Sequence, residues 1–289
     1  MSEAQRPTIV ITGATRGIGL LLARYFASEN WSVAICARDE ASVIEVSRDI
    51  ASEFGVPTVG GCADVGDPND MASFAETVRA QLGPTTALIC NAGVLGPVGS
   101  PKHVDAESWS SAINVNVAGS FNAIKAFWND LQNSPIGRII LMSGGGVGGP
   151  NPMKRASAYV ASKAAVSSLA ESIATDLEGT SCTINAVAPG AFPTSFMADV
   201  LDVGTEVAGH ELYVDASGRT GHIAPGSASK LLELVEFLVS PLSGHINGRT
   251  LSANWNRVDG LQKGAFDDDD QNYLRMRRID NDLFWSVKS

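Results

Sequence analysis

Two ionisable side chains one helical turn apart are the clearest sign of chemistry in this sequence. Tyr159 and Lys163 lie four residues apart in a long segment of helical periodicity, so they share one helix face. A phenol normally titrates at about 10, and an ammonium group one turn away favours the phenolate and lowers that pKa. Tyr159 is therefore predicted to exchange a proton with an alkoxide or alcohol. On its own, the pair equally fits the surface of an amphipathic helix.

A glycine-rich turn near the N-terminus predicts a dinucleotide site. Residues 12–19 read TGATRGIG, directly after an apolar run and directly before a helical pattern. Glycine lets the backbone turn tightly and approach a pyrophosphate, and the N–H groups and positive dipole end of the helix favour the anion. The spacing is G-x-x-x-G-x-G rather than G-x-G-x-x-G. The strand and helix context therefore favours dinucleotide binding over an ordinary strand-to-helix turn.

The end of the second apolar run distinguishes between two dinucleotides. An acidic side chain there would accept hydrogen bonds from the adenosine ribose and repel a 2′-phosphate. The run ends instead in Arg38, whose planar fork of donors suits a phosphate, and Arg16 in the glycine turn can reach the same group. We therefore expect NADP(H) in preference to NAD(H). The alternative is that both arginines are solvated surface residues, and the neighbouring Asp39 slightly weakens the preference.

These side chains need a framework of strands and helices to hold them. Short runs rich in Val, Ile and Ala alternate with helix-length segments whose apolar residues recur at three-and-four spacing. This alternation predicts the α/β class, with a doubly wound parallel sheet and helices on both faces. The nearly continuous apolar strands fit a sheet that is covered on both sides. Strands are expected at 8–12, 32–37, 58–63, 86–90, 137–142, 182–187 and 249–253, and helices at 18–28, 157–177 and 227–239.

Length, composition and charge restrict the class of protein. The 289 residues are 44% hydrophobic and include no linker-like run, so one domain over residues 1–289 is expected. The formal charge of -10 argues against a nucleic-acid partner and leaves a small-molecule role. A polar N-terminus and the absence of long apolar runs predict a cytoplasmic protein without a membrane partner. The four cysteines have neither zinc-site nor disulfide spacing, so no metal is expected.

The order of these motifs resembles that of the classical short-chain dehydrogenase/reductase family. The resemblance covers roughly residues 8–194, and its specificity lies in the combination of motifs. It implies a Rossmann-type fold, oxidoreductase activity with a nicotinamide cofactor, and assembly as a homodimer or homotetramer. The matching motifs are the glycine turn, Asn91-Ala92-Gly93 after the fourth strand, Asn116 in NVNVAGSF, Ser143 after the fifth strand, Tyr159 with Lys163, and Pro189-Gly190 after the sixth strand.

The resemblance also implies a role for each matching position. The substrate would be a carbonyl or alcohol, Tyr159 the acid/base, and Lys163 an additional ligand of the nicotinamide ribose. Asn116, in preference to Asn114, would hold a water of the proton relay through its local backbone. The implied cofactor-binding residues are Gly13, Thr15, Arg16, Gly17, Ile18, Gly19, Asp64, Val65, Asn91, Ala92, Gly93, Tyr159, Lys163, Pro189, Gly190, Phe192 and Thr194.

The catalytic serine is a departure from the family pattern. In the family, a serine just past the fifth strand hydrogen-bonds the substrate oxygen. Counting from Gly137 places Gly144 at that position, and the interval from Ser143 to Tyr159 is longer than the family's common one. We expect the glycine-rich loop to bend and deliver Ser143 as a catalytic residue. The alternative is a site with no serine donor, with a low rate or unusual chemistry.

Two segments are candidate walls of the substrate site. Residues 191–225 lack clean periodicity and predict an irregular substrate lid. The loop at 144–155 is the second candidate. Its Lys154 and Arg155 either meet an anionic substrate or are simply two exposed basic residues.

Three further side chains and the C-terminus complete the expectations. His210, Tyr213 and His222 are expected in packing or solvent rather than on the substrate. Residues 256–289 form an extension that covers the active site or packs on a neighbouring subunit. Within it, Asp267–Asp270 are interpreted as a solvated acidic face, because calcium-loop spacing is absent.

Three hypotheses of function follow from these residues. The first is an NADP(H)-dependent carbonyl reductase or alcohol dehydrogenase, and it uses every motif. The second keeps the fold and cofactor but makes the protein a non-catalytic sensor or assembly partner, as the displaced serine and the unusual tail suggest. The third is a nucleotide-sugar epimerase or dehydratase, which also pairs Tyr with Lys but usually has a different glycine spacing and a longer chain.

Overall fold

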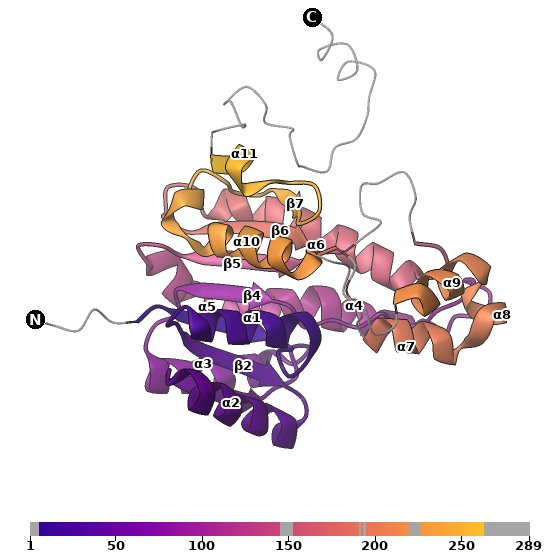
Figure 1. Ribbon diagram of the computed structural model, residues 1–289, viewed down its shortest axis with the longest axis horizontal. Coiled ribbons are helices and arrows are strands. Elements are labelled where there is room, and N and C mark those ends of the chain that lie inside the picture. The colour runs from indigo at the N-terminus through magenta and orange to yellow at the C-terminus, as the bar shows by residue number, and fades with distance from the viewer. Residues whose placement is uncertain (1–5, 145–152, 191, 193–194, 220–225, 263–289) are drawn as a thin grey trace, which may run out of the picture.

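Parallel strands form a seven-stranded sheet in the described part of the protein (Figure 1). The strand order is β3-β2-β1-β4-β5-β6-β7, and every neighbouring pair is parallel. The expected doubly wound α/β fold is therefore confirmed. The computed structural model describes residues 6–144, 153–190, 192, 195–219 and 226–262. The strands are β1 (Thr8–Thr12), β2 (Ser32–Ala37), β3 (Thr58–Cys62), β4 (Ala87–Cys90), β5 (Arg138–Met142), β6 (Thr183–Ala188) and β7 (Thr250–Ser252).

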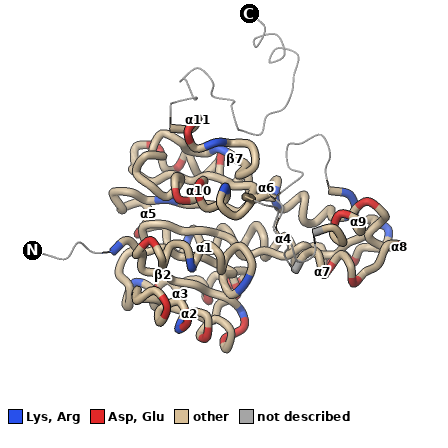
Figure 2. Tube along the Cα trace, in the orientation of Figure 1, with Lys and Arg blue, Asp and Glu red and all other residues tan. Residues whose placement is uncertain are grey.

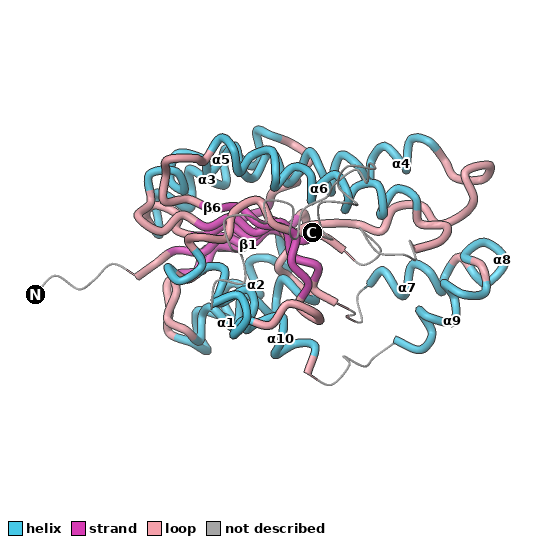
Figure 3. The backbone as a smooth tube through the Cα atoms, turned by 90° about the horizontal axis from the view of Figure 1, so that it is seen from above, coloured by secondary structure: helices cyan, strands magenta, loops and turns pink. Residues whose placement is uncertain are grey.

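Two layers of helices cover the sheet. Figure 3 shows α1, α2 and α10 on one side of the strands and α3, α5 and α6 on the other, with α4 continuing the second layer. A π-helical turn, Asn114–Ala118, joins α4 to α5, and a short 3-10 turn, Pro241–Ser243, follows α10. The covering helices are α1 (Gly17–Ser28), α2 (Glu40–Phe54), α3 (Pro68–Leu82), α4 (Ala106–Ile113), α5 (Gly119–Asn133), α6 (Ser157–Asp176) and α10 (Ser227–Val239).

The core explains why the central strands are nearly continuous apolar runs. Ile9 and Ile11 of β1 pack in the cluster that contains α1 and α10 side chains. Val10, between them, packs in the cluster that contains α3, α5 and α6 side chains. Because successive side chains of a strand point to opposite faces, covering both faces buries every position of β1. The predicted strands begin and end within one residue of the observed ones.

The segment that was expected to be irregular contains helices instead. Three short helices, α7 (Ser195–Asp202), α8 (Gly204–Ala208) and α9 (His210–Arg219), project beyond the sheet beside α4 and α6 (Figure 1). We call these three helices the lid. The expectation of irregular backbone is wrong for residues 195–219, because the helices there are short and the helical spacing of Phe196, Met197, Val200 and Leu201 in α7 was overlooked.

The described start of the C-terminal extension packs on the core. The last described helix, α11 (Val258–Gln262), follows β7, and its Leu261 is buried in the cluster that contains α10. Asp267–Asp270 lie outside the described residues. Among the four cysteines, Cys62 is exposed and the others are buried. No described helix is both long enough and apolar enough to cross a membrane.

The strand order determines where a ligand can bind. From β1 the chain proceeds to β2 and β3 on one side, and it later returns to β4 on the other side of β1. In open parallel sheets, ligands bind at the carboxyl ends of the strands where this reversal occurs. The glycine turn follows β1 and Asn91 follows β4, so both lie at the reversal.

Candidate active site

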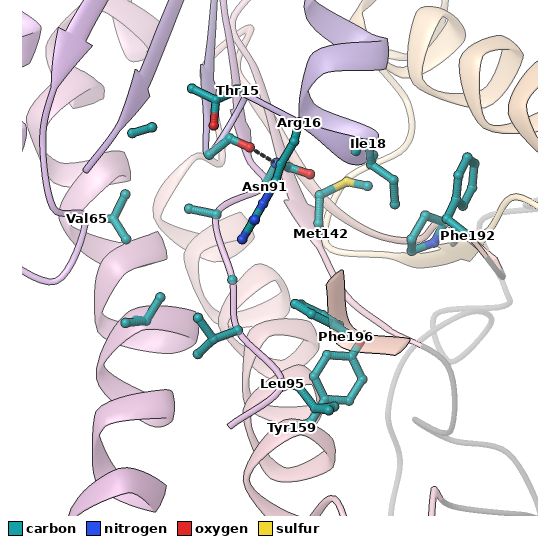
Figure 4. Close-up of a pocket in the computed structure, with 18 of the residues that line it drawn as sticks. Thr15, Arg16, Ile18, Val65, Asn91, Leu95, Met142, Tyr159, Phe192 and Phe196 are labelled. Atoms are coloured by element: carbon teal, nitrogen blue, oxygen red, sulfur yellow. Dashed lines mark hydrogen bonds between the residues drawn. The ribbon is translucent and has the colours of Figure 1, made fainter. Parts of the chain in front are cut away.

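A cavity of about 950 Å³ lies at the carboxyl ends of the strands. Its lining begins at the glycine turn and continues past the ends of β2 to β6 to the lid. Figure 4 shows Thr15 and Arg16 at one end of the cavity, with Leu95, Tyr159 and Phe196 gathered at the other. The dinucleotide candidates and the acid/base candidate therefore line one cavity.

Most of the expected site residues line this cavity. Gly19 packs behind the glycine turn, where an added Cβ would lie 2.5 Å from the Asn91 amide nitrogen. Asn116 is completely buried next to the cavity, and Thr194 lies outside the described residues. The expected residues on the wall are Gly13, Thr15, Arg16, Gly17, Ile18, Arg38, Asp64, Val65, Asn91, Ala92, Gly93, Ser143, Tyr159, Lys163, Pro189, Gly190 and Phe192.

Hydrogen bonds fix the glycine turn to the end of β4. The Asn91 amide donates to the carbonyl oxygens of Thr12 and Gly13, each at 2.9 Å. The Thr12 hydroxyl in turn accepts from the backbone N–H groups of Asn91 and Ala92. Gly13 has φ +66°, and an added Cβ would lie 2.7 Å from the Ala92 Cα. Only glycine fits this close approach of two backbones.

The N-terminus of α1 suits an anion. Arg16 is its N-cap residue, and the Arg16 side chain makes no capping hydrogen bond. The first turn contains no acidic residue. At Gly17, with φ +58°, an added Cβ would meet no atom within 4 Å, so the backbone is open on that side. The free N–H groups and the positive dipole end therefore form a cradle that fits the pyrophosphate of a dinucleotide.

Two arginines lie at the same end of the cavity. Arg16 and Arg38 are exposed and line the wall after β1 and β2. Asp39 beside them is the N-cap of α2 and accepts from the Ser42 N–H at 2.8 Å. Hydrogen bonds from Ser42 hold the pKa of Asp39 below its usual value. Since Asp39 is committed to the helix cap, the arginine pair is left to recognise a phosphate.

The remaining candidates of the dinucleotide end follow β3 and β6. Asp64 accepts from the Gly66 N–H at 2.8 Å, which turns the chain beside the cavity. Val65 next to it is 6% exposed. After β6, Gly190 has φ +89°, and an added Cβ would lie 2.9 Å from the Asn254 amide nitrogen. Asn254 also lines the cavity, and the sequence offered no motif that singled it out.

Tyr159 and Lys163 both lie on the buried face of α6. Tyr159 is 9% exposed and Lys163 is 5% exposed. The ammonium of Lys163 donates to the Met142 carbonyl at 2.7 Å and lies 5.8 Å from the centre of the Tyr159 ring. Lys163 is therefore anchored to the end of β5, while the phenol faces the cavity.

Burial dominates the ionisation of this pair. It raises the pKa of Tyr159 to about 12 and lowers the pKa of Lys163 to about 8. The pKa of Tyr159 is therefore raised in the described chain, and the net lowering expected from Lys163 is not found. The physical reason is that desolvation penalises the charged form of each group and outweighs an ammonium that is bound to the Met142 carbonyl.

Asn116 lies in the π-helical turn between α4 and α5. Its side-chain oxygen accepts from the Val94 N–H at 2.8 Å, and its amide donates to the Val94 carbonyl and to the Ser162 hydroxyl. Ser162 in turn donates to the Tyr159 carbonyl at 2.8 Å. These bonds link the turn to α6, whereas Asn114 is exposed. Single π-turns inside α-helices occur frequently at functional sites.

The Ser143 hydroxyl makes its hydrogen bonds to groups of α6. It is buried, bonds to the Ser167 hydroxyl at 3.0 Å and donates to the Lys163 carbonyl at 3.2 Å. Gly144 instead lies against the phenol, because an added Cβ would be 2.5 Å from the Tyr159 hydroxyl oxygen. In the described chain, Gly144 rather than Ser143 therefore lies against the phenol. The backbone turns the Ser143 side chain towards α6 and leaves glycine at the family's serine position.

The lid supplies an apolar wall above Tyr159. The Phe196 ring packs edge-on against the Tyr159 ring, with centroids 5.6 Å apart and an interplanar angle of 78°. Leu95 and Leu212 are buried in the same cluster, with Met197 packed against it. These residues were missed, although the spacing of Phe196, Met197, Val200 and Leu201 gives α7 an apolar face that could have identified it.

The basic residues before α6 hold the lid rather than face the cavity. Arg155 donates to the carbonyls of Glu206 and Val207 at the end of α8, at 2.9 and 2.7 Å. Lys154 forms an exposed ion pair with Glu211, at 2.8 Å. Neither basic residue lines the cavity. The interpretation of Lys154 and Arg155 as a site for an anionic substrate is therefore not supported.

Two other expectations concern side chains of the lid. His210 is exposed at the start of α9, and Tyr213 is half-buried against the apolar cluster. Neither lines the cavity, as expected. His222 lies outside the described residues.

Solved structures resemble this fold along nearly its whole length. The crystal structure of a variant actinorhodin polyketide ketoreductase with NADPH is 27% identical and has a TM-score of 0.74, covering 87% of this chain and 97% of that one. The structure of NAD+-bound xylitol dehydrogenase has a TM-score of 0.72 at 22% identity, covering 86% of this chain and 98% of that one. The second likeness shows the fold alone.

Curated relatives and a family profile agree with these structures. The 2-(S)-hydroxypropyl-CoM dehydrogenase 3 of Xanthobacter autotrophicus is 30% identical over 88% of this chain and 97% of its own length. The 3-oxoacyl-[acyl-carrier-protein] reductase of Staphylococcus aureus is 30% identical over 85% and 95%. The sequence profile of the short chain dehydrogenase family matches residues 7–202. With this match and the site geometry, the chain belongs to the classical short-chain dehydrogenase/reductase family of oxidoreductases.

Proposed function

We propose that this chain is an NADP(H)-dependent oxidoreductase that moves a hydride between the nicotinamide and a carbonyl or alcohol of a small molecule. Tyr159 is its acid/base. The observation that carries the proposal is that Tyr159, Lys163 and the glycine turn line one cavity. Burying an ammonium costs free energy, and a protein that only binds a dinucleotide needs neither this ammonium nor a buried phenol.

The cofactor assignment rests on the donors at the glycine-turn end. The cradle at Gly17 suits the pyrophosphate, and Arg16 with Arg38 suits a 2′-phosphate. When bound, the nicotinamide supplies or accepts the hydride. Lys163 binds the nicotinamide ribose in this proposal. The other assigned contacts are Gly13, Thr15, Ile18, Gly19, Asp64, Val65, Asn91, Ala92, Gly93, Pro189, Gly190, Phe192 and Thr194.

The proton is transferred by Tyr159. Because burial raises its pKa to about 12, the phenol is protonated at neutral pH. It donates that proton to the substrate oxygen as the oxygen gains negative charge, and it recovers the proton in the reverse reaction. The Lys163 ammonium, near the ring, stabilises the phenolate. Asn116 holds a water of the proton relay through its local backbone.

The substrate oxygen receives no hydrogen bond from a serine in this proposal. Ser143 is bonded to Ser167 and to the Lys163 carbonyl, and Gly144 has no side chain to offer. Loss of one preorganised donor typically lowers turnover by about 100- to 1,000-fold. We therefore expect slow turnover compared with a site that has a serine donor.

The names of relatives and neighbours support the reaction class but not a substrate. One relative is named for oxidising a hydroxypropyl group and another for reducing a 3-oxoacyl group. These substrates have only an alcohol or carbonyl in common. The neighbouring structures include both NADPH and NAD+ complexes, so the NADP(H) preference rests on Arg16 and Arg38.

We also propose that residues 1–289 act as one unit, in the cytoplasm, as a homodimer or homotetramer. The assembly is what membership of the family implies. Light scattering measures the molar mass of the purified protein directly. A monomeric mass over the working concentration range would contradict the assembly.

The test of the function compares Tyr159→Phe with Tyr213→Phe, which removes a hydroxyl from the lid outside the cavity. Each protein is titrated with NADPH and NADH by fluorescence, and NADPH oxidation is then followed with a panel of ketones and aldehydes. Wild type and Tyr213→Phe should turn over at least one carbonyl. Tyr159→Phe should bind NADPH normally but lose about 100- to 10,000-fold in rate.

The other outcomes of this test would contradict part or all of the proposed function. A near-normal rate for Tyr159→Phe would remove Tyr159 from the acid/base role. Tight NADPH binding without turnover in wild type would favour the sensor hypothesis. Failure to bind either nucleotide would contradict the proposal as a whole.

A further inference from the structure

The end of the cavity beneath the lid is apolar. Leu95 and Leu212 are buried there at 2% and 6% exposure, and Met153, Phe196, Met197 and Val200 also line this end of the cavity. Figure 4 shows Leu95 and Phe196 next to the Tyr159 ring. The flexible, polarizable methionines allow this wall to adapt to apolar groups of different shape.

Charged side chains line the cavity at its other end. Arg16, Arg38, Asp39 and Asp64 all lie around the proposed dinucleotide site. The one further charged group on the described wall, Lys163, donates to the Met142 carbonyl. Within the described wall, no cation therefore faces the apolar end as a partner for a substrate anion.

The lid itself is acidic. Its residues 195–219 contain five carboxylates and a single arginine. Figure 2 shows acidic positions on α7, α8 and α9. The nearby Lys154 and Arg155 are bound to Glu211 and to the α8 carbonyls. The local field therefore opposes the approach of an anion to the mouth of the cavity.

The undescribed segments that directly adjoin the wall or the lid in sequence contain no lysine or arginine. These segments are 145–152, 191, 193–194 and 220–225. Against the described wall, a negatively charged substrate group would therefore be desolvated without a cationic partner, whereas an apolar group would be transferred favourably from water.

We infer that the substrate is a neutral carbonyl or alcohol whose remainder is mostly apolar. This inference rests on the proposed oxidoreductase function and specifies its substrate class. The carbonyl oxygen lies at the Tyr159 hydroxyl, and the apolar remainder contacts Leu95, Phe196 and Leu212. Substrates with a carboxylate, sulfonate or phosphate on that remainder are rejected.

The test uses matched probes that differ in one ionised group. Acetophenone is compared with 4-acetylbenzoate, and methyl benzoylformate with benzoylformate, at saturating NADPH. Nucleotide-saturated protein is also titrated calorimetrically with each probe. The neutral member of each pair should have the higher kcat/KM and the tighter binding, by about 100-fold.

A charge placed in the wall tests the location. Met197→Lys puts an ammonium on a side chain of similar length within the apolar end, and it should reduce the neutral-to-anion ratio by about 10-fold or more. Val214→Lys adds the same charge on the exposed face of α9, outside the cavity, and should leave the ratio unchanged. Equal changes in both variants would show that the net charge of the lid, not the wall, sets the preference, and would overturn the inference.

The remaining outcomes separate the two proposals. Equal or better use of the anionic probes by wild type would overturn the substrate class and leave the oxidoreductase function intact. If no probe is turned over, the proposed function fails with these carbonyls, and the calorimetric preference still decides whether the cavity selects neutral molecules. Absence of a binding preference there would overturn the inference.

Discussion

A Cβ atom built on Gly144 would lie 2.5 Å from the hydroxyl oxygen of Tyr159. The same Cβ would lie 2.9 Å from the ring carbon that bears the hydroxyl and 3.1 Å from Cγ of Lys163. Because Gly144 has no side chain, the Tyr159 phenol can occupy the space next to it. The hydroxyl of the preceding Ser143 is turned to α6, where it bonds to Ser167.

Gly144→Ala should displace the acid/base. The new methyl group cannot be accommodated without moving the Tyr159 phenol, which is held between α6 and the lid. A misplacement of about 1 Å costs about 100-fold in rate, so we expect a loss of that order in kcat with little change in NADPH affinity. Steady-state kinetics and a fluorescence titration measure the two quantities.

Ser143→Ala is the matched variant at the adjacent position. Because its hydroxyl bonds only within the protein, kcat should stay within about threefold of wild type. Stability should fall by about 1–2 kcal/mol, since buried partners in Ser167 and the Lys163 carbonyl lose a hydrogen bond. A loss of turnover as large as that of Tyr159→Phe would restore Ser143 as a catalytic donor.

Local sequence patterns were sufficient to predict the sheet and the position of the site. Helices cover both faces of the strand that contains Ile9 to Ile11. The strand is therefore an apolar run that can be recognised in the sequence. The position of the glycine turn after that strand followed from the same pattern. A parallel sheet collects the ends of its strands at one edge, so motifs far apart in sequence were correctly expected to meet.

Features that depend on tertiary contacts were not predictable in this way. The direction of the Ser143 hydroxyl depends on Ser167, which lies 24 residues further along the chain. The pKa of Tyr159 depends on burial under the lid, whereas the sequence shows only its neighbour Lys163. The helices of the lid are too short to be stable alone, and α8 ends where Arg155 binds its last carbonyls.

Arg38 should determine the choice of dinucleotide. Arg38→Ala removes a donor fork beside the proposed 2′-phosphate site, while the Asp39 cap of α2 stays in place. Charge-assisted hydrogen bonds contribute about 1.5–3 kcal/mol, so the NADPH Kd should rise by about 10- to 100-fold and the NADH Kd by less than about threefold. Arg24→Ala, which removes an exposed pair with Glu53 outside the cavity, is the control. Equal losses for both nucleotides would contradict the NADP(H) preference.

Arg155 should control the position of the lid. Its two hydrogen bonds to the end of α8 hold the lid to the segment before α6. Arg155→Ala should increase hydrogen exchange in residues 204–219 and raise KM for the substrate by about 3- to 10-fold, with NADPH binding unchanged. Lys154→Ala breaks only an exposed ion pair, which contributes roughly 0–1 kcal/mol. Indistinguishable effects of the two variants would show that Arg155 has no specific role.

Lys163 should give the stability of the protein a pH dependence of known sign. Burial lowers the pKa of its ammonium from 10.5 to about 8 in the folded chain. Between these values the unfolded chain binds more protons at this residue than the folded chain does, so the free energy of unfolding rises with pH. The contribution of Lys163 to the free energy of unfolding has its full value above pH 10.5 and is lost as the pH falls through about 8. Its slope is at most about 1.4 kcal/mol per pH unit.

Lys163→Met isolates this contribution, because it keeps the length of the side chain and removes the titrating group. Urea unfolding of both proteins gives the free-energy difference, wild type minus variant, which should increase between about pH 8 and about pH 10. The buried thiols of Cys36 and Cys182, whose raised pKa gives the opposite trend, are present in both proteins and cancel. Lys125→Met, at an exposed lysine of α5, reports any trend that the substitution itself produces. If the difference does not change with pH, burial does not lower the pKa of the Lys163 ammonium in the folded chain.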